Sequence, residues 1–204
     1  MRYAETHRDE THRKLLKVAA AELRDKGPDR LGVAEVMKTA GLTHGGFYAH
    51  FKSKDALLSE TLEEIFAQSQ RRVDRMLDGL PPKHALATYI DFYVSTRHRD
   101  DPSNGCPITA LNSDLPRQSR KFRSTFESGV NRLSDLLARL IDDAHVADAK
   151  RIAPAILAAM AGAVALSRTI SDPQLSDDLL ASTREGIKSR LGLTDSALAS
   201  ERTR

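Results

Sequence analysis

Residues 33–51, Val-Ala-Glu-Val-Met-Lys-Thr-Ala-Gly-Leu-Thr-His-Gly-Gly-Phe-Tyr-Ala-His-Phe, contain two helical patterns separated by one tight turn. In the first pattern apolar residues recur at spacings of three and four up to Ala40, as they do along one face of an α-helix. Gly41 follows, and glycine readily adopts the left-handed conformation that ends a helix. We therefore expect the first helix to end at Gly41.

The three residues after this glycine predict the start of a second helix. Leu42 is apolar and is placed to fill the crevice between the two helices. Thr43 can accept hydrogen bonds from the first amides of the next helix, which predicts that it is the N-cap and that the helix begins at His44.

The second helix has one apolar face and one face that is free to contact a partner. Phe47 and Phe51 are four residues apart, so they share a face and are assigned to the core. His44, Tyr48 and Ala49 point elsewhere. A helix-turn-helix places its second helix in the major groove of DNA, which is about 12 Å wide, so the pattern predicts a duplex-DNA partner.

At these residues the chain resembles the tetracycline-repressor (TetR) family of bacterial regulators, over the stretch from Leu15 to Leu58. The matching features are the first helix with Leu15, Leu16, Ala19 and Leu23, the Lys26-Gly27 that closes it, Val33 to Ala40, Gly41-Leu42-Thr43, Phe47-Tyr48-Ala49-His50-Phe51 and Lys54-Asp55-Ala56-Leu57-Leu58. A Gly-Cys-Pro segment at residues 105–107 also resembles a subset of TetR-like regulators.

The resemblance implies a set of DNA contacts. Phosphate contacts are implied for Thr43, Tyr48, His50 and Lys54, and base contacts for His44, the backbone of Gly45 and Gly46, and Ala49 through a thymine methyl group. Many family members have Lys in place of His44 and Thr or Ser in place of Gly46. Two interpretations stay open for the two glycines: they let the helix approach the groove floor closely, or they leave a weak helix that orders on DNA.

The rest of the chain has helical patterns throughout, which predicts an all-α fold of about nine helices. The expected helices span 55–78, 83–98, 106–114, 116–144, 149–170 and 174–191. In the TetR architecture three helices form the helix-turn-helix DNA-binding domain and the others form a larger regulatory and dimerisation domain. We expect the first domain over residues 1–54, the second over 55–191, and a flexible tail over 192–204.

The resemblance also implies a homodimer and a small-molecule effector of unknown identity. The last two helices of TetR proteins pair with those of a second copy, which assigns the dimer interface to Ile156, Met160, Ala163, Val164, Leu179, Leu180 and Ile187. In TetR proteins several helices of the regulatory domain line an effector cavity. From the aromatic and apolar side chains in the corresponding helices, we expect the ligand pocket to contain Tyr89, Phe92, Tyr93, Cys106, Phe122, Phe126 and Met160. For each pocket or interface residue, burial in the monomer core is the alternative.

Charge and composition are compatible with a DNA-binding protein of the cytoplasm. Residues 1–54 contain 11 Lys and Arg against 7 Asp and Glu, whereas the remainder contains 20 against 21. Cys106 is the single cysteine, which excludes an intrachain disulfide, and no signal segment is visible at the N-terminus. The apolar run from Ala155 to Leu166 is shorter than the ~20 residues that cross a bilayer, so no membrane partner is expected.

Enzymatic function is the main competing class, and the sequence gives it no support. The seven histidines are scattered without a metal-binding spacing, and the chain has neither a phosphate-binding glycine-rich loop nor a Gly-x-Ser-x-Gly motif. We therefore expect no catalytic residues, no metal and no cofactor. A DNA-binding architectural protein without an effector is a third alternative.

Cys106 gives a second functional hypothesis, a regulator that senses oxidants or electrophiles through a thiol. The residue is placed at the expected start of a helix, where the helix dipole lowers the pKa of a thiol. A lone cysteine is more often a small packing residue. The sequence does not identify the operator, the effector or the regulated genes. It also does not distinguish a repressor from an activator, although repression is the usual mode of the family.

Overall fold

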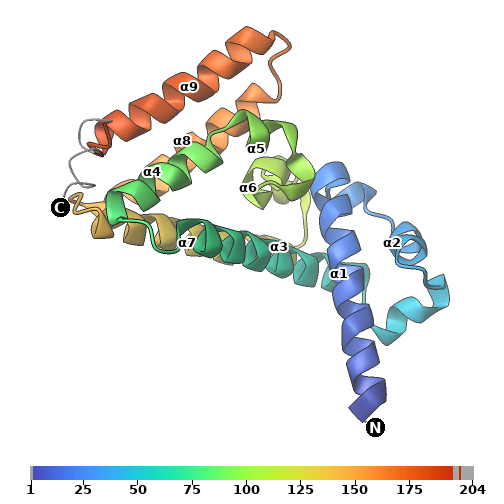
Figure 1. Cartoon of the computed structure of the whole chain (residues 1–204). Coiled ribbons are helices and arrows are strands. Elements are labelled where there is room, and N and C mark those ends of the chain that lie inside the picture. Colours follow the sequence, from blue (N-terminus) through green and yellow to red (C-terminus); the bar gives the residue numbers. More distant parts are fainter. Residues whose placement is uncertain (1, 195–197, 199–204) are drawn as a thin grey trace. The chain divides into compact units, whose positions relative to one another are not determined.

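The computed structural model describes the backbone of residues 2–194 and 198, and the side chains from residue 8 onward within that range. These residues form nine α-helices and three short 3₁₀ segments and contain no strand, which confirms the all-α prediction (Figure 1). The elements are α1 (Arg2–Arg30), α2 (Val33–Thr39), η1 (His44–Ala49), α3 (Lys54–Leu77), α4 (Pro82–Tyr93), α5 (Thr96–Asp100), η2 (Pro102–Asn104), α6 (Pro107–Leu111), η3 (Leu115–Arg117), α7 (Arg120–Asp143), α8 (Ala149–Ser167) and α9 (Pro173–Arg190).

The chain divides into two compact units, each made of two segments. Unit 1 comprises Met1–Ser69 and Pro102–Gly129, and unit 2 comprises Gln70–Asp101 and Val130–Arg204. Unit 1 is thus larger than the DNA-binding domain expected over 1–54, because α6 and η2 return to pack against α1. The bounds of the DNA-binding domain, residues 1–54, stay a prediction.

Helix α1 supplies the core of unit 1. Leu15, Ala19 and Leu23 are fully buried along one face. Gly27 interrupts the helix with a left-handed backbone (φ 77°), which agrees with its expected role of closing the first helix. An added Cβ there would lie 2.9 Å from a carboxylate oxygen of Asp114, so a side chain at Gly27 has little room as well as the wrong φ.

A close helix crossing in unit 1 depends on a second glycine. A Cβ added to Gly129 in α7 would lie 2.1 Å from the ring of Phe66 in α3. The same ring packs edge-on against Phe126, with 6.0 Å between ring centroids. The absence of a side chain at Gly129 therefore sets how closely the two helices approach at this point.

Unit 2 is built on the antiparallel pair of α8 and α9, onto which α4 and α5 pack. The helix expected over 83–98 is broken in two, and this correction has a local cause. The backbone leaves the helix at Val94, and the Ser95 hydroxyl then accepts from the amide of His98 at 3.1 Å and caps α5. The periodicity of apolar residues continues across the break, so it did not indicate the new helix start.

The packed structure continues beyond α9 into residues that were expected to belong to the flexible tail. Gly192 is left-handed, and the amide of Leu193 donates to the carbonyl of Lys188 at 2.9 Å, as in a Schellman motif. Leu193 is 1% exposed, so residue 193 belongs to the packed structure. Residues 195–197 and 199–204 of the predicted flexible tail lie outside the described residues.

Among the described residues, α8 is the one helix whose length and composition would allow it to cross a bilayer. The helix has 19 residues, longer than the apolar run in the sequence suggested. Half of its most apolar window is buried inside the protein, as in the core helix of a globular domain, so the property is weak support for a membrane segment.

Candidate nucleic-acid interface

The turn that follows α2 is a Schellman motif. The amide of Gly41 donates to the carbonyl of Lys38 at 2.9 Å, and the amide of Leu42 donates to that of Met37 at 2.8 Å. Gly41 has φ 77°, which confirms the predicted left-handed position. These two bonds satisfy carbonyls at the end of α2 and reverse the chain toward η1.

The element after the turn begins at His44 as expected, but it is a 3₁₀ helix and its cap differs from the prediction. Thr43 is at the N-cap position with an extended backbone, yet its side chain makes no capping hydrogen bond. The amide of Gly46 donates instead to the Thr43 carbonyl at 3.0 Å. Two consecutive glycines favour helix formation poorly, which accounts for a short, tightly wound element in place of a regular α-helix.

The apolar face of η1 packs as predicted. Phe47 is 3% exposed and Phe51 2% exposed, and their rings stack with 5.6 Å between centroids. The ring of His12 in α1 lies 4.7 Å from that of Phe51. This packing buries one face of η1 and places α1 beside the residues that follow it, so the other residues of η1 face outward.

The residues predicted to contact DNA lie on one short stretch at the surface of unit 1. Thr43, His44, Gly45, Tyr48 and Ala49 are exposed, whereas Gly46, His50 and Lys54 are half-buried. Tyr48 is 74% exposed, the highest value among the large apolar side chains that the structure describes. The Tyr48 ring is therefore accessible to a partner.

Neither glycine of η1 is required by the packing of the protein. A Cβ added to Gly45 would meet no atom within 4 Å, and one added to Gly46 would meet the Met37 side chain at 3.6 Å, an ordinary contact. The protein has room for side chains at both positions. This observation favours the interpretation in which the glycines leave space for the DNA.

Lys54 is the first residue of α3, and its side chain contacts the end of α1. Its Nζ donates to the carbonyl oxygen of Asp29 at 3.2 Å. The Asp29 carboxylate accepts in turn from the side-chain amide of Gln118 at 2.8 Å. Asp29 at the end of α1 therefore positions Lys54. Asp29 is itself bound by Gln118, which precedes α7.

Two basic residues near η1 were missed from the sequence. Arg8 in α1 donates to the carbonyl of Ala49 at 2.8 Å, at the end of η1. The Nζ of Lys14 lies 4.0 Å from the position that a Cβ of Gly41 would occupy. Arg8 lies seven residues before Leu15, on the face of α1 that is buried further along, and this spacing is the signal that could have identified it.

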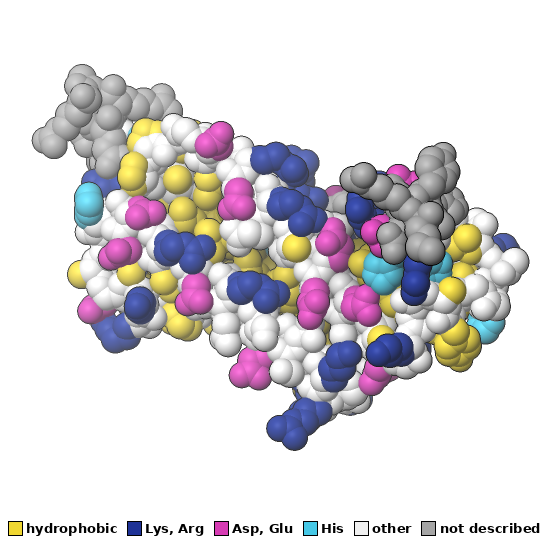
Figure 2. All heavy atoms as spheres, turned by 90° about the horizontal axis from the view of Figure 1, so that it is seen from below, with side chains coloured by type: hydrophobic (Ala, Val, Ile, Leu, Met, Phe, Trp, Pro, Cys, Tyr) yellow, Lys and Arg dark blue, Asp and Glu magenta, His cyan; other side chains and the backbone are white. Residues whose placement is uncertain are grey.

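His50 has an unusual electrostatic environment. Its pKa is lowered from the ordinary value of 6.5, first by burial and then by the nearby charges of His12 and Arg8. Elsewhere on the molecule, acidic and basic side chains are interspersed over the face that Figure 2 draws.

The residues assigned to an effector pocket belong to two different units. Cys106, Phe122 and Phe126 are in unit 1, whereas Tyr89, Phe92, Tyr93 and Met160 are in unit 2. Within unit 2 the Tyr93 ring packs edge-on against both Tyr89 and His98. Two surface hollows of unit 2, about 610 Å³ beside Asp135 and Arg139 and about 310 Å³ beside Arg99 and Arg168, contain none of the assigned residues.

The structure does not support activation of the Cys106 thiol by a helix dipole. Cys106 does precede α6, but that helix has five residues, and the thiol does not cap it. The residue is 8% exposed. Because a one-turn helix has a weak dipole and the thiol is largely buried, the arrangement is typical of a packing cysteine.

Most residues assigned to the dimer interface are buried within the chain, which agrees with the alternative of monomer core, and their role in a dimer stays a prediction. The exposed fraction is at most 7% for Ile156, Met160, Ala163, Val164, Leu180 and Ile187, whereas Leu179 is half-buried. These six residues form the packing between α8 and its neighbours. Sequence periodicity located the apolar face of each helix but did not show which partner covers it.

A different face of α8 and α9 is open. On α8 it consists of Ala155, Ala158, Ala159, Gly162 and Leu166, and on α9 of Leu175, Leu179, Ser182 and Gly186. Leu166 and Leu175 are 58% and 57% exposed. On each helix most of these residues are three or four apart, so they share a face. We call the two faces together the open stripe.

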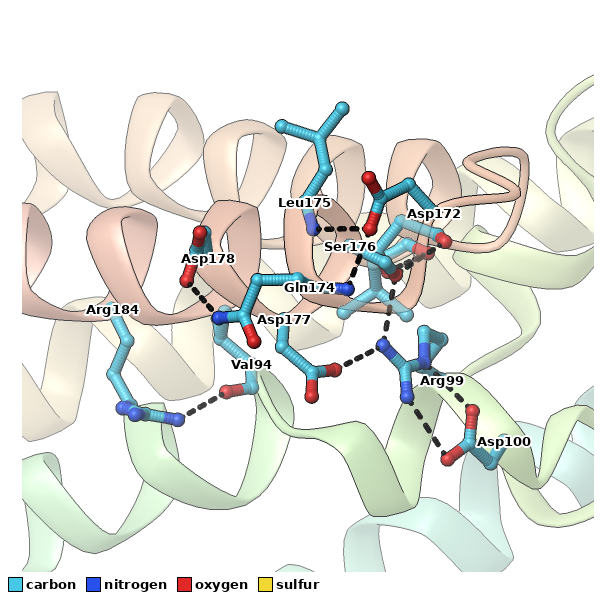
Figure 3. A network of polar contacts seen from close by, with 12 residues as sticks. Val94, Arg99, Asp100, Asp172, Gln174, Leu175, Ser176, Asp177, Asp178 and Arg184 are labelled. Carbon is cyan, nitrogen blue, oxygen red and sulfur yellow. Dashed lines mark hydrogen bonds and ion pairs between the residues drawn. The ribbon is translucent and has the colours of Figure 1, made fainter.

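Polar contacts attach α5 to α9 in unit 2 (Figure 3). Arg99 extends from α5 and donates to the Ser176 hydroxyl at 2.8 Å and to the Asp177 carboxylate, while its Nε and other terminal nitrogen donate to Asp100. One guanidinium is thus held by groups from both helices. Such a planar group with several fixed partners orients the two helices relative to each other.

Two further arginines bind free carbonyl groups at helix ends. Arg168, just after α8, donates to the carbonyl oxygens of His98 and Arg99 at 2.8 and 3.0 Å. Arg184 in α9 donates to the carbonyl of Val94 at 3.2 Å, as Figure 3 also shows. The last carbonyls of a helix have no partner within it, so these side chains replace the missing donors.

Comparisons with known proteins agree with this geometry. Residues 15–61 match the profile of "Bacterial regulatory proteins, tetR family", and residues 82–177 match that of "Transcriptional regulator LmrA/YxaF-like, C-terminal domain". The chain belongs to the TetR family. Members of this family are non-enzymatic DNA-binding regulators. The further resemblance of the Gly-Cys-Pro segment to a subset of the family stays a prediction.

Several TetR-family relatives are similar over part of their length. The chain is 27% identical to the regulator YvdT of Bacillus subtilis over 44% of the chain and 47% of that protein, so it spans about half of this relative. It is 23% identical to the repressor NemR of Escherichia coli over 66% of the chain and 68% of NemR. It is 33% identical to the repressor KstR2 of Mycolicibacterium smegmatis over 42% of each protein.

Solved structures share the fold across most of the chain. The reduced form of E. coli NemR superposes with a TM-score of 0.73 at 20% identity, covering 86% of this chain and 96% of NemR. A TetR-family regulator from Cytophaga hutchinsonii gives a TM-score of 0.76 at 18% identity, covering 88% of this chain and 94% of that one. At these identities the likeness supports the fold.

Proposed function

We propose that this TetR-family protein is a transcriptional repressor that binds a two-fold symmetric operator as a homodimer. The observation that carries the proposal is the exposed face of η1, where Tyr48 extends from an element whose buried Phe47 stacks on Phe51. A rigid scaffold that presents polar and aromatic groups on a short helix after a tight turn suits insertion into the major groove. We place this activity in the cytoplasm, without a membrane partner.

In this proposal the contacts divide into positioning and reading. Thr43, Tyr48, His50 and Lys54 contact phosphates, and Lys54 does so from the first turn of α3, where free amides also attract an anion. His44, Gly45, Gly46 and Ala49 face the bases. Arg8 joins the positioning residues, because it is exposed and is attached to the end of η1.

Replacement of Tyr48 tests the interface directly. The probe is an operator duplex that the wild-type protein selects from a random pool. We expect Tyr48→Ala to weaken binding to it by about tenfold or more, because a hydrogen bond to a phosphate and an aromatic contact are lost. Leu80→Ala, at another exposed large side chain, is the matched control and should bind like the wild type. Equal affinity of the Tyr48→Ala protein, measured by fluorescence anisotropy, would show that η1 does not contact DNA.

A second copy of the chain covers the open stripe in the proposed dimer. Small residues on both helices allow close approach, and a Cβ added to Gly162 or Gly186 would meet no atom of its own chain within 4 Å. Leu166 and Leu175 then lose their exposure to water on dimerisation. Packing of two such helix pairs forms a four-helix bundle, the usual arrangement of helical dimers of this kind.

A small hydrophobic effector releases the operator in this proposal. The candidate contacts within unit 2 are the assigned residues Tyr89, Phe92, Tyr93 and Met160, of which Tyr89 and Tyr93 form an edge-on pair. Effector binding shifts α3, which runs from unit 1 into unit 2, and so changes the separation of the two η1 elements in the dimer. A panel of hydrophobic compounds that left operator affinity unchanged, with the protein folded and dimeric, would contradict this release mechanism.

A further inference from the structure

His50 occupies a distinctive position at the end of η1. It is the C-cap residue, it is half-buried, and its neighbours in sequence are the exposed Ala49 and the buried Phe51. Its Nδ1 atom is buried and has no hydrogen-bond partner. The half-exposed ring therefore reaches solvent along the edge that carries Nε2.

This geometry selects one form of the imidazole. A neutral ring has a proton on one nitrogen and a lone pair on the other, whereas a protonated ring has N–H groups at both. A proton on Nδ1 would be a buried donor without an acceptor, which is unfavourable. The proton therefore belongs on Nε2, where water or an oxygen of a partner can accept it.

The surrounding charges favour the same form. Arg8 and His12 in α1 lie close to His50, with His12 6.3 Å away between ring centroids, and their charges, like burial, lower its pKa. Glu60 in α3 pairs with His12, with 3.0 Å between Oε2 and Nε2. This carboxylate is therefore engaged by His12.

We propose that His50 binds a DNA phosphate as a neutral imidazole, through a hydrogen bond donated from Nε2, and not as a cation. This inference rests on the proposed function and specifies the chemistry of one of its contacts. His50 then differs from Lys54, which meets the phosphate with a full positive charge. A neutral donor positions the duplex but displaces no counterion from it.

Two amide substitutions separate the proposed donor from the rest of the ring. A glutamine amide nitrogen can occupy the position of Nε2, whereas that of asparagine lies near Nδ1. The probe is the operator duplex that the wild-type protein selects from a random pool. We expect the affinity of His50→Gln for this duplex to be within about threefold of the wild-type affinity, and that of His50→Asn to be about three- to tenfold lower. Thermal unfolding followed by circular dichroism checks that both variants are folded.

The salt dependence of binding tests the absence of charge. We expect the slope of log affinity against log salt concentration to be the same for the wild type and His50→Gln, whereas Lys54→Gln should reduce its magnitude by about 0.9. A reduction of that size in His50→Gln would overturn the proposal, because it identifies a cationic contact. Equal affinities of the wild type, His50→Gln and His50→Asn would also overturn it.

The same experiments distinguish this inference from the function on which it rests. If the wild-type protein selects no duplex, or if Tyr48→Ala binds as tightly as the wild type, the proposed function fails. If Tyr48 and Lys54 are required but the His50 variants give a cationic slope, the function stands and the neutral contact is wrong.

Discussion

At the scale of single residues, the glycines near the turn have two different uses. Gly41 has φ 77°, and its backbone conformation closes α2. Gly45 and Gly46 have no such requirement, and the protein offers room for a methyl group at both. The first glycine serves the fold, and the other two serve the proposed contact with the groove.

Alanine substitutions distinguish these two uses. We expect Gly46→Ala to leave the free energy of unfolding unchanged or to raise it by up to about 1 kcal/mol, since alanine restricts the unfolded chain, and to weaken operator binding because the methyl group occupies space meant for DNA. Gly41→Ala should instead destabilise the protein by about 1–2 kcal/mol, because a side chain is strained in the left-handed region. Urea denaturation and fluorescence anisotropy measure the two effects, and undiminished operator affinity of Gly46→Ala would contradict close approach.

Residues whose role is set by neighbours in sequence could be predicted, and residues whose role is set by distant contacts could not. Gly41, Phe47 and Phe51 were predicted, because helix termination and the spacing of apolar residues are local properties. Arg8 was missed because its carbonyl partner is 41 residues away. The expected Thr43 cap failed because η1 winds as a 3₁₀ helix, in which a backbone carbonyl accepts the amide of Gly46.

His98 makes the stability of the protein depend on pH. It is buried, its Nδ1 lies 2.7 Å from the carbonyl oxygen of Tyr93, and burial lowers its pKa below the ordinary 6.5, with Arg168 and Arg72 acting in the same direction. Between the folded and unfolded pKa values the unfolded chain binds more protons, so acidification favours unfolding. The stabilising contribution of neutral His98 is present above about pH 6.5 and is lost as the pH falls below it.

We therefore expect the free energy of unfolding to decrease from about pH 7.5 to about pH 5.5, and to decrease less in His98→Asn. The asparagine amide keeps a donor for the Tyr93 carbonyl but does not titrate. His44→Asn, at an exposed position, is the control and should keep the pH dependence of the wild type. Identical pH profiles of His98→Asn and the wild type in urea denaturation would remove His98 as the source.

At the scale of elements, the contact of α3 with α7 in unit 1 depends on one missing side chain. The ring of Phe66 occupies the space where a Cβ of Gly129 would be. Helices that pack this closely exclude even one added methyl group unless the ring or the backbone moves.

Gly129→Ala is therefore expected to destabilise the protein by about 1–3 kcal/mol in urea denaturation, despite the higher helix propensity of alanine. Phe66→Leu removes part of the ring, so the double variant should lose less stability than the sum of the two single variants. Gly45→Ala, at a position without neighbours, is the matched control. A Gly129→Ala protein at least as stable as the wild type would show that the two helices separate without cost.

Sequence periodicity predicts helices but does not locate every helix boundary. The start of η1 at His44 agrees with prediction, because Gly41 ends the preceding helix with a left-handed backbone. The break between α4 and α5 was missed, since the apolar pattern continues through Val94 while Ser95 starts a new helix. The arginines that stabilise these helix ends come from α8 and α9, and no local pattern identifies them.

At the scale of the whole molecule, the open stripe is the surface that the proposed dimer requires. Leu166 and Leu175 are more than half exposed, whereas six of the seven residues first assigned to the interface are buried. Apolar periodicity predicted both helices and their amphipathic character. Which apolar face is internal depends on the packing of α8 against α9, and the sequence of a single helix does not contain that information.

Charged residues in the stripe should prevent assembly without unfolding the chain. We expect the double variant Leu166→Glu, Leu175→Glu to be monomeric in light scattering coupled to size-exclusion chromatography, because four carboxylates would have to be desolvated in the dimer. Operator affinity should fall by at least about tenfold, since each half-site is then bound separately. Leu80→Glu, at an exposed leucine outside the stripe, should stay dimeric, and a dimeric double variant would place the interface elsewhere.

The central claim is that the exposed face of η1 reads a two-fold symmetric operator, and selection of duplexes from a random-sequence pool tests it most directly. The account predicts that the wild-type protein enriches inverted repeats whose half-sites are centred about 34–36 Å apart, one turn of DNA, and that Tyr48→Ala enriches none. Binding without enrichment of any sequence, with an affinity set by salt concentration alone, would contradict it.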